Sequence, residues 1–130
     1  MNQVVENKNI KLETLKNRSD FLRVAGARKK WVTPAMVIQL SDALFDDHDI
    51  IHIGYTASKK VGNAVARSRA KRRMREAAKK VFTGCGFKKN TYVLIARQEI
   101  LSYPFDQLIR DMKWALKRLH GKTKDKKEGT

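Results

Sequence analysis

Cysteine is almost absent from this chain of 130 residues, because Cys85 is its single thiol and no internal disulfide can form. A small secreted protein stabilised by disulfide bonds is therefore excluded, and a reducing cytoplasm is the expected location. Long apolar runs are missing too, since no stretch approaches the roughly 20 residues that a membrane-spanning helix needs. Residues 1–16 mix acidic and basic side chains and lack the apolar centre of a signal peptide. We expect a cytoplasmic protein that does not enter a membrane.

Acidic residues are scarce in the middle of the chain. Between Asp49 and Glu99 the only acid is Glu76, whereas thirteen lysines and arginines lie in the same stretch. The whole chain carries a formal net charge of +16 at pH 7. Charges of one sign at this density repel each other and destabilise a compact state unless a polyanion relieves them. The expected partner is therefore negatively charged.

The residues themselves form no evident catalytic or metal-binding constellation. His48, His52 and His120 fall in an acidic loop, a strand and a helix end, and none has a second ligand at metal or triad spacing. The aspartates of residues 42–49 lack the alternating oxygen ligands and the closing glutamate of a calcium loop. Glycine-rich phosphate-binding motifs are also absent. We predict no catalytic residue and no metal ligand in the protein alone.

The length and the hydrophobic content of 42% allow one modest core and hence one folded domain. Residues 1–14 are polar and predict a flexible arm, residues 15–121 the domain, and residues 122–130 a mobile basic tail. Ser19 is the expected cap of a first helix and Ser102 of the last, which has Pro104 in its first turn. The predicted elements are a helix ending near 26, strands at 28–32, 35–40, 50–57 and 91–96, a helix at 64–81 and a helix from 102 to 121.

The predicted helix at 64–81 gives the strongest functional signal. It carries eight bases against Glu76, so like charges face each other at many three- and four-residue spacings. Phosphate contact would offset that repulsion and release counterions, which makes binding strong and dependent on salt. A merely solubilising face would interleave both signs, and a membrane-surface helix would offer larger apolar residues. Its apolar stripe consists of mostly small side chains: Ala66, Ala70, Met74, Ala77, Ala78 and Val81.

Two aromatic residues near the N-terminus have two interpretations. Phe21 lies on the predicted first helix, and Trp31 follows Arg28, Lys29 and Lys30. Either ring can simply fill the core, which an early amphipathic helix needs. If Phe21 instead borders an open groove, it offers a flat face on which an unpaired base can stack. Composition does not decide between the two.

The segment Ser58–Ala77, SKKVGNAVARSRAKRRMREA, closely resembles the protein subunit of bacterial ribonuclease P. The resemblance extends over roughly residues 15–119 and includes the segments 15–24, 53–57, 92–97 and 101–103. It implies an α+β sandwich of the order α-β-β-β-α-β-α, similar to a ribosomal protein. The expected sheet has four strands and a left-handed β-α-β crossover through the basic helix, against the general right-handed rule.

The resemblance also implies a function. In this family the RNA subunit is the catalyst and uses Mg²⁺ to remove the 5′ leader from precursor tRNA, an endonucleolytic tRNA-processing step. The protein binds ribonuclease P RNA and precursor tRNA within a ribonucleoprotein and is inactive alone. No tightly bound metal, membrane or further protein partner is implied for the protein.

Site residues follow from the resemblance position by position. The expected contacts to the catalytic RNA are Arg67, Ser68, Arg69, Lys71, Arg72 and Arg75. The expected leader-binding residues are Phe21, Lys60, Thr56, Val37 and Gln39. Two positions depart from the family pattern: Ser68 stands where asparagine is usual, and Ala25 where an aromatic is frequent. Ser68 keeps only a hydroxyl for hydrogen bonding, and Ala25 removes a stacking face.

Two other classes of protein remain open from the residues alone. One is a ribosomal protein of the same fold, which would assemble with ribosomal RNA. The other is a DNA-binding regulator that uses the basic helix for recognition. The bases surround most of that helix and lack an edge of asparagine or glutamine, which favours phosphate contact over base reading.

Overall fold

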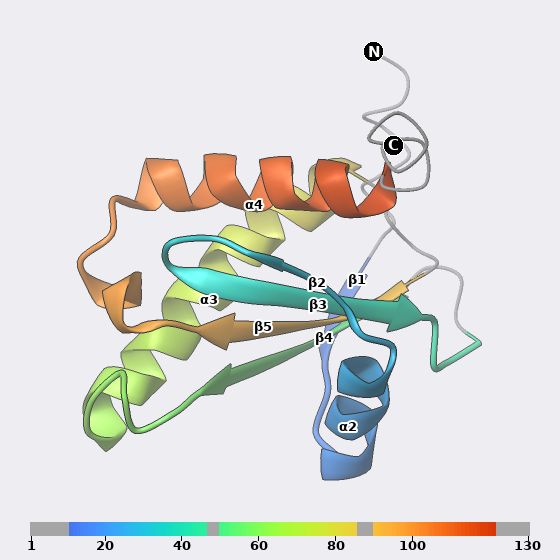
Figure 1. The fold of residues 1–130 in the computed structure, drawn as a ribbon, viewed down its shortest axis with the longest axis horizontal. Helices are drawn as coiled ribbons and strands as arrows, with labels where there is room; N and C mark the ends of the chain where they lie inside the picture. The colour runs from blue at the N-terminus through green and yellow to red at the C-terminus, as the bar shows by residue number, and fades with distance from the viewer. Residues whose placement is uncertain (1–10, 47–49, 86–89, 122–130) are drawn as a thin grey trace.

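The computed structural model of the chain describes residues 11–46, 50–85 and 90–121. The described strands form one sheet, and the helices pack on it (Figure 1). No helix in these ranges is long and apolar enough to cross a membrane. The elements are β1 (Lys11–Thr14), α2 (Arg18–Gly26), β2 (Lys29–Val32), β3 (Met36–Asp42), β4 (Ile50–Ala57), α3 (Ala64–Cys85), β5 (Asn90–Ala96), η2 (Gln98–Leu101) and α4 (Phe105–His120).

The sheet is mixed and has five strands in the order β1-β4-β5-β3-β2. The prediction of four strands was therefore one short, and the predicted arm is not wholly without structure. The additional strand is β1, which pairs in parallel with β4 through the register Lys11↔Ile50 to Thr14↔Ile53. Its sequence, KLET, has only Leu12 turned partly inward. Four residues are too few for an alternating pattern to be recognised in the sequence. This strand is therefore evident only from its pairing with β4.

The crossover from β4 to β5 is left-handed, as the family resemblance implied. Both strands run from right to left in Figure 1, β5 lies above β4, and α3 passes behind them. The two strands pair directly and in parallel, from Ile53↔Tyr92 to Ala57↔Ala96. Strand β3 then pairs antiparallel with β5 on its other side.

Alternation along the strands gives the sheet two covered faces. Ile38, Ile53 and Leu94 point to the face covered by α3 and α4 and belong to the larger core. Val93 points to the opposite face, where it packs with Leu15 and with Val24 of α2. The side chains of the larger core therefore hold α3 in place, while a smaller cluster holds α2.

The apolar stripe predicted on α3 is confirmed from Ala70 onward, whereas Ala66, its first predicted member, is only half-buried. Ala70, Met74, Ala77, Ala78 and Val81 are all fully buried against the sheet and α4. The helix runs past the predicted end at 81 to Cys85. At its start the Asn63 Oδ1 accepts a hydrogen bond of 2.9 Å from the backbone amide of Ala66, which caps the first turn.

Both predicted serine caps were wrong. Helix α2 begins at Arg18, where the Asn17 carbonyl accepts from the amide of Asp20, so Ser19 lies inside the helix. Helix α4 begins at Phe105 after Pro104, while Ser102 ends the unpredicted 3₁₀ turn η2. The proline sets the helix start because its ring fixes φ near the helical value and it has no amide to satisfy.

The end of α4 is attached to the sheet by a polar contact inside the core. The hydroxyl of Tyr92 on β5 lies 2.7 Å from Nε2 of His120, and the Tyr92 ring also packs edge-on against Phe82. Burial lowers the pKa of His120, and the positive charge of Lys29 lowers it further. The folded protein therefore disfavours a protonated imidazole at this position.

The lowered pKa of His120, which burial and the charge of Lys29 cause, makes stability depend on pH. The unfolded chain binds a proton at His120 with the ordinary pKa of about 6.5, more readily than the folded protein does. The free energy of unfolding is therefore expected to fall as the pH drops through about 6.5. His120→Gln should flatten this part of the profile, as measured by urea denaturation of both proteins across the range. An unchanged profile in the variant would assign the effect to other groups.

Candidate nucleic-acid interface

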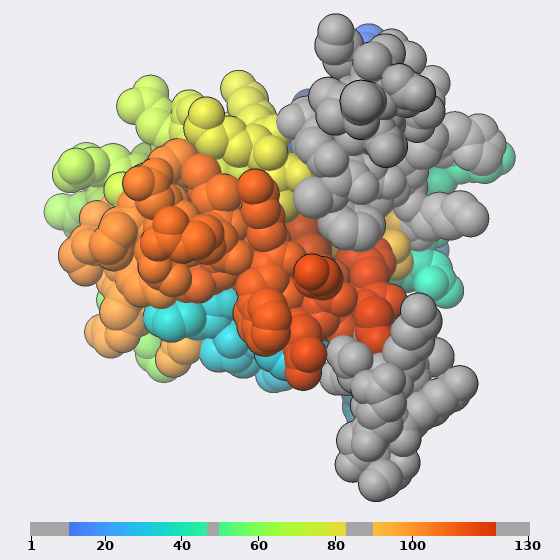
Figure 2. Space-filling model, turned by 90° about the horizontal axis from the view of Figure 1, so that it is seen from above, coloured from blue at the N-terminus to red at the C-terminus, as the bar shows by residue number. Residues whose placement is uncertain are grey.

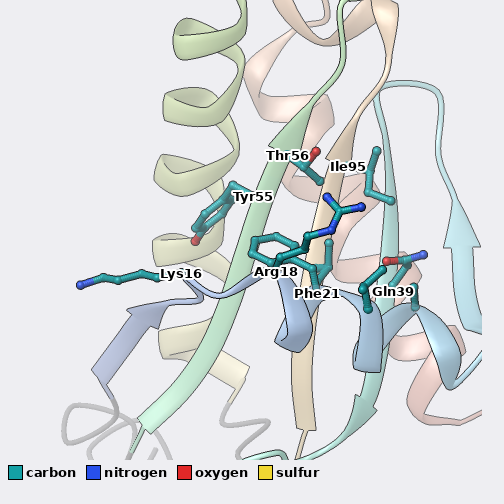
Figure 3. Close-up of a pocket in the computed structure, with 10 residues that line it drawn as sticks. Lys16, Arg18, Phe21, Gln39, Tyr55, Thr56 and Ile95 are labelled. Carbon is teal, nitrogen blue, oxygen red and sulfur yellow. The ribbon is translucent and has the colours of Figure 1, made fainter.

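A groove of about 490 Å³ lies between α2 and the exposed strip of the sheet beside it. Figure 3 shows Phe21 from α2 facing Thr56, Ile95 and Gln39 from three neighbouring strands. The remaining lining residues are Lys16, Arg18, Leu22, Ala25, Tyr55 and Val93. The groove therefore has an aromatic and aliphatic floor and positive charges at its entrance.

The groove exists because β1 is shorter than β4. Strand β1 pairs only as far as Ile53, and the backbone amide of Leu15 then donates to the Ile53 carbonyl at 3.0 Å. The chain turns away there and enters α2, so no strand among the described residues pairs with the Gly54–Ala57 end of β4 on that side. Lys16 and Arg18 lie at this turn, and Figure 3 shows Arg18 reaching toward Thr56 and Ile95 while Lys16 extends away from them.

The ring of Phe21 is seated on Gly54. A Cβ atom at position 54 would lie 2.5 Å from Cε2 and 2.7 Å from Cζ of Phe21, and 3.2 Å from Cδ1 of Leu15. Only glycine allows the ring to approach the strand this closely. Phe21 remains half-buried, so one part of the ring contacts the strand and another part faces the groove.

The structure separates the five expected leader-binding residues. Phe21, Thr56 and Gln39 line the groove together. Val37 lies on the same face of β3, opposite Ile95 in the register, but does not line the groove. Lys60 lies in the turn after β4 and lines a separate hollow of about 300 Å³ with Arg97 and Glu99. Their binding roles stay predictions.

The outer side of α3 contains a second hollow of about 470 Å³. Of the six residues expected to contact the catalytic RNA, five line it: Ser68, Arg69, Lys71, Arg72 and Arg75. Val65 completes the lining and is 66% exposed, so the hollow is open to a large partner. Arg67 does not line it, because the helical period places its half-buried side chain on the flank of α3.

One base of α3 is used within the fold. Arg73 is half-buried, donates a hydrogen bond to the carbonyl of Tyr103, and lies 5.6 Å from the ring centroid of Phe105. It therefore ties α3 to the start of α4. The bases that surround most of this helix are therefore not all available for phosphate contact.

Tyr55 connects the groove to the hollow on α3. Its ring lines the groove, and Cζ of Arg75, which lines the hollow, lies 5.7 Å from the ring centroid. Burial raises the pKa of Tyr55 to about 12, although the charge of Arg75 opposes the rise. The phenol is therefore neutral at physiological pH and keeps its proton for hydrogen bonding.

Several groove residues were not predicted from the sequence. Lys16, Arg18 and Tyr55 are the polar ones, and Val93 and Ile95 form part of the floor. The alternation in β5 could have indicated that Val93 and Ile95 share a face. Nothing local indicates Lys16 and Arg18, because their position depends on where β1 ends. Among the described residues, no group of three or more histidine, cysteine or acidic side chains could hold a metal ion.

An aromatic groove with basic residues at its mouth, next to a helix dense in exposed arginine, is the arrangement of an RNA-binding protein. Residues 10–120 match the family described as Ribonuclease P. The chain belongs to the ribonuclease P protein family, whose members are protein components of the bacterial tRNA-processing endoribonuclease ribonuclease P. Of the classes left open by the sequence, this match decides against a ribosomal protein and a DNA-binding regulator.

Curated relatives and solved structures agree with this assignment. A ribonuclease P protein component from Paramagnetospirillum magneticum is 45% identical over 111 residues, covering 84% of both chains. One from Ruegeria pomeroyi is 46% identical over 110 residues, covering 84% of this chain and 87% of that protein. The ribonuclease P protein of Staphylococcus aureus superimposes with a TM-score of 0.66 at 27% identity, covering 80% of this chain and 92% of that one.

The contact between Phe21 and Gly54 can be tested by substitution. Gly54→Ala should destabilise the protein by about 1–3 kcal/mol, because the added methyl group overlaps the ring. In a Phe21→Ala background the same change should cost clearly less, since the ring is gone. Chemical denaturation of the four proteins measures the coupling.

Gly26→Ala is the matched control for this cycle. No atom lies within 4 Å of a Cβ built at Gly26, so this change should cause no loss of stability. Equal losses for Gly54→Ala with and without Phe21 would contradict the contact.

Proposed function

We propose that this protein binds the catalytic RNA through the outer side of α3 and holds the single-stranded 5′ leader of precursor tRNA in the groove beneath α2. The observation that carries the proposal is the contact of Tyr55 with Arg75, which makes the groove and the hollow on α3 neighbours. An RNA docked on α3 then has a substrate strand beside it. Cleavage of the leader leaves the mature 5′ end of the tRNA.

The exposed bases of α3 supply the contact to the catalytic RNA. Arg69 and Arg72 are both exposed and line the same hollow, so a phosphate backbone can reach both guanidinium groups. Arginine forms two parallel hydrogen bonds with a phosphate, which fixes orientation as well as attraction. Ser68 lines the same hollow and adds a short hydroxyl, suited to a close or water-bridged contact.

The groove can bind an unpaired nucleic-acid strand with little dependence on its base sequence. The half-buried ring of Phe21 presents a face for one base, and Gln39 and Thr56 present hydrogen-bonding groups across the floor. Lys16 and Arg18 at the entrance can neutralise the adjoining phosphates. Ala25 lines the groove one turn after Phe21, so the position offers room in place of a second aromatic face.

The chemistry is assigned to the RNA subunit, and Mg²⁺ supplies the activation of water and the stabilisation of the leaving oxygen there. The protein's own groups bind and orient the RNA partners. By neutralising phosphates on both polyanions, they lower the repulsion between catalytic RNA and substrate. The protein is therefore expected to be inactive alone and to restore cleavage by its RNA at low magnesium. Hydrolysis by protein that is rigorously free of RNA would overturn this assignment.

Substitutions on α3 test the contact with the catalytic RNA. Arg69→Ala combined with Arg72→Ala should weaken assembly with ribonuclease P RNA. It should also reduce the slope of log affinity against log salt by about 0.7–0.9 for each phosphate that the variant no longer neutralises. Filter binding over a range of potassium chloride concentrations measures both quantities.

A charge-matched control is Lys11→Ala with Arg23→Ala, two exposed bases that line neither the groove nor the hollow. It should leave most of the affinity and the slope in place. An equal reduction in both double variants would mean that net charge, and not the surface of α3, determines binding.

A substitution at Phe21 tests the groove. Phe21→Leu keeps an apolar side chain on Gly54 but removes the flat ring. In the holoenzyme it should weaken binding of precursor tRNA with a long leader by about tenfold, the equivalent of roughly 1.4 kcal/mol of stacking. Precursor with a very short leader should bind as before. If both substrates weaken equally, Phe21 does not act through the leader.

A further inference from the structure

A third surface, remote from the groove and from the exposed side of α3, lies where α4 runs beside β2. Figure 2 shows the orange and red α4 on this side of the molecule, with the cyan β2–β3 hairpin next to it. Strand β2 is the edge of the sheet opposite β1. We call this surface the tryptophan patch, and it comprises Lys29, Trp31, Lys113, Trp114, Lys117 and Arg118.

The centre of the patch is an arginine beside two indole rings. Cζ of Arg118 lies 5.7 Å from the ring centroid of Trp31 and 5.0 Å from that of Trp114. Trp31 is half-buried and packs against the larger core. Cation–π contacts of this kind hold the rings in place. The two tryptophans are therefore part of one ordered surface that joins β2 to α4.

Trp114 has no role in filling the core. It is 54% exposed, whereas Leu108, Met112 and Leu116 on the other side of α4 are fully buried. A single exposed apolar side chain is common, but Arg118 contacts this indole and that of Trp31, so Trp114 is part of a larger aromatic patch. Beyond its contact with Arg118, the ring therefore offers an ordered aromatic surface that remains exposed.

Most of the charges around Trp114 are positive. Lys113 and Lys117 on α4 are exposed, and Lys29 on β2 is exposed on the side that faces the end of α4. Asp111, an acid of the same helix, already accepts hydrogen bonds from the Tyr103 hydroxyl at 2.5 Å and the Gln107 amide at 3.0 Å. The patch thus combines an exposed aromatic face with lysines on either side of it.

We infer that the tryptophan patch binds a single-stranded segment of RNA, with a base stacked on Trp114 and its phosphates on Lys29, Lys113 and Lys117. This goes beyond the proposed function, because none of its residues lines the groove or the hollow on α3. The carboxylates of an acidic peptide would satisfy the lysines but do not stack on the indole face, whereas each nucleotide supplies both a phosphate and a flat base. A membrane surface would require several large apolar side chains, and on α4 Trp114 is the exposed one.

The fluorescence of the chain's own tryptophans can report binding at this surface. The two tryptophans both belong to the patch, so tryptophan fluorescence senses a base that stacks there and not one bound in the groove. Trp31→Phe keeps an aromatic ring in the core and leaves Trp114 as the sole fluorophore. Oligouridylate added to this variant at low salt should quench the emission saturably, and added salt should reverse the quenching.

Charge reversal identifies the residues responsible. Lys113→Glu with Lys117→Glu, in the Trp31→Phe background, should raise the oligouridylate concentration at half-quenching by about tenfold or more. The matched control is Lys11→Glu with Arg23→Glu, at exposed positions outside the patch, and should shift it much less. Circular dichroism checks that each variant is folded, which is expected because all four side chains are exposed.

Three outcomes would overturn the inference. One is the absence of saturable quenching by oligouridylate. A second is an equal shift in the two charge-reversal variants. The third is quenching by polyglutamate as strong as by oligouridylate, which would indicate an acidic protein partner. Phe21→Leu should leave the quenching intact, so failure here and failure of the leader-binding proposal are distinguishable.

Discussion

The close packing of α3 on the sheet is the constraint on which the rest of the molecule depends. A helix with so many bases repels itself, and the stripe that includes Ala70, Ala77 and Ala78 holds it against the strands. Small side chains let the helix approach closely, so its rotation about its own axis is fixed. That rotation decides which base faces outward, which faces α4 and which faces Tyr55. The positive charges of α3 therefore lie at defined positions relative to the sheet and to α4.

The second determinant is the point at which β1 stops. A strand that continued beside the whole of β4 would cover the edge from which Tyr55 reaches both the groove and Arg75. The chain instead turns into α2 and lays Phe21 on Gly54. Packing on one face of the sheet thus fixes α3. On the other face, the early end of β1 leaves room for the groove. The two sites share β4 as their common support.

Much of this could be predicted from the sequence, because periodic patterns report burial. The strand at 50–57 and the stripe on α3 were predicted correctly, since both depend on alternation or helical spacing within one segment. The strand β1 and the role of Arg73 could not be predicted. Arg73 has the same chemistry as its neighbours on α3, and only the position of Tyr103 and Phe105 distinguishes it.

The leader-binding set shows the same limit. Phe21, Thr56 and Gln39 come from three elements and meet because the sheet places them on one face. Lys60 lies beyond the end of β4, and the direction of the turn after that strand, which no local pattern specifies, carries it to another hollow. The family resemblance supplied the residues, and the tertiary structure decides which of them share a surface.

The parallel pairing of β1 with β4 has a consequence for how the molecule is assembled. It joins Lys11 to Ile50 across the whole of α2, β2 and β3, so its contacts are distant in sequence. Closing such a loop loses chain entropy before any contact compensates for it, which slows the step. The pairings of β4 and of β3 with β5 close loops at least as long, so only the β2–β3 hairpin of this sheet is local in sequence. We therefore expect slow, cooperative folding in which the substrate groove and the surface for the catalytic RNA form together.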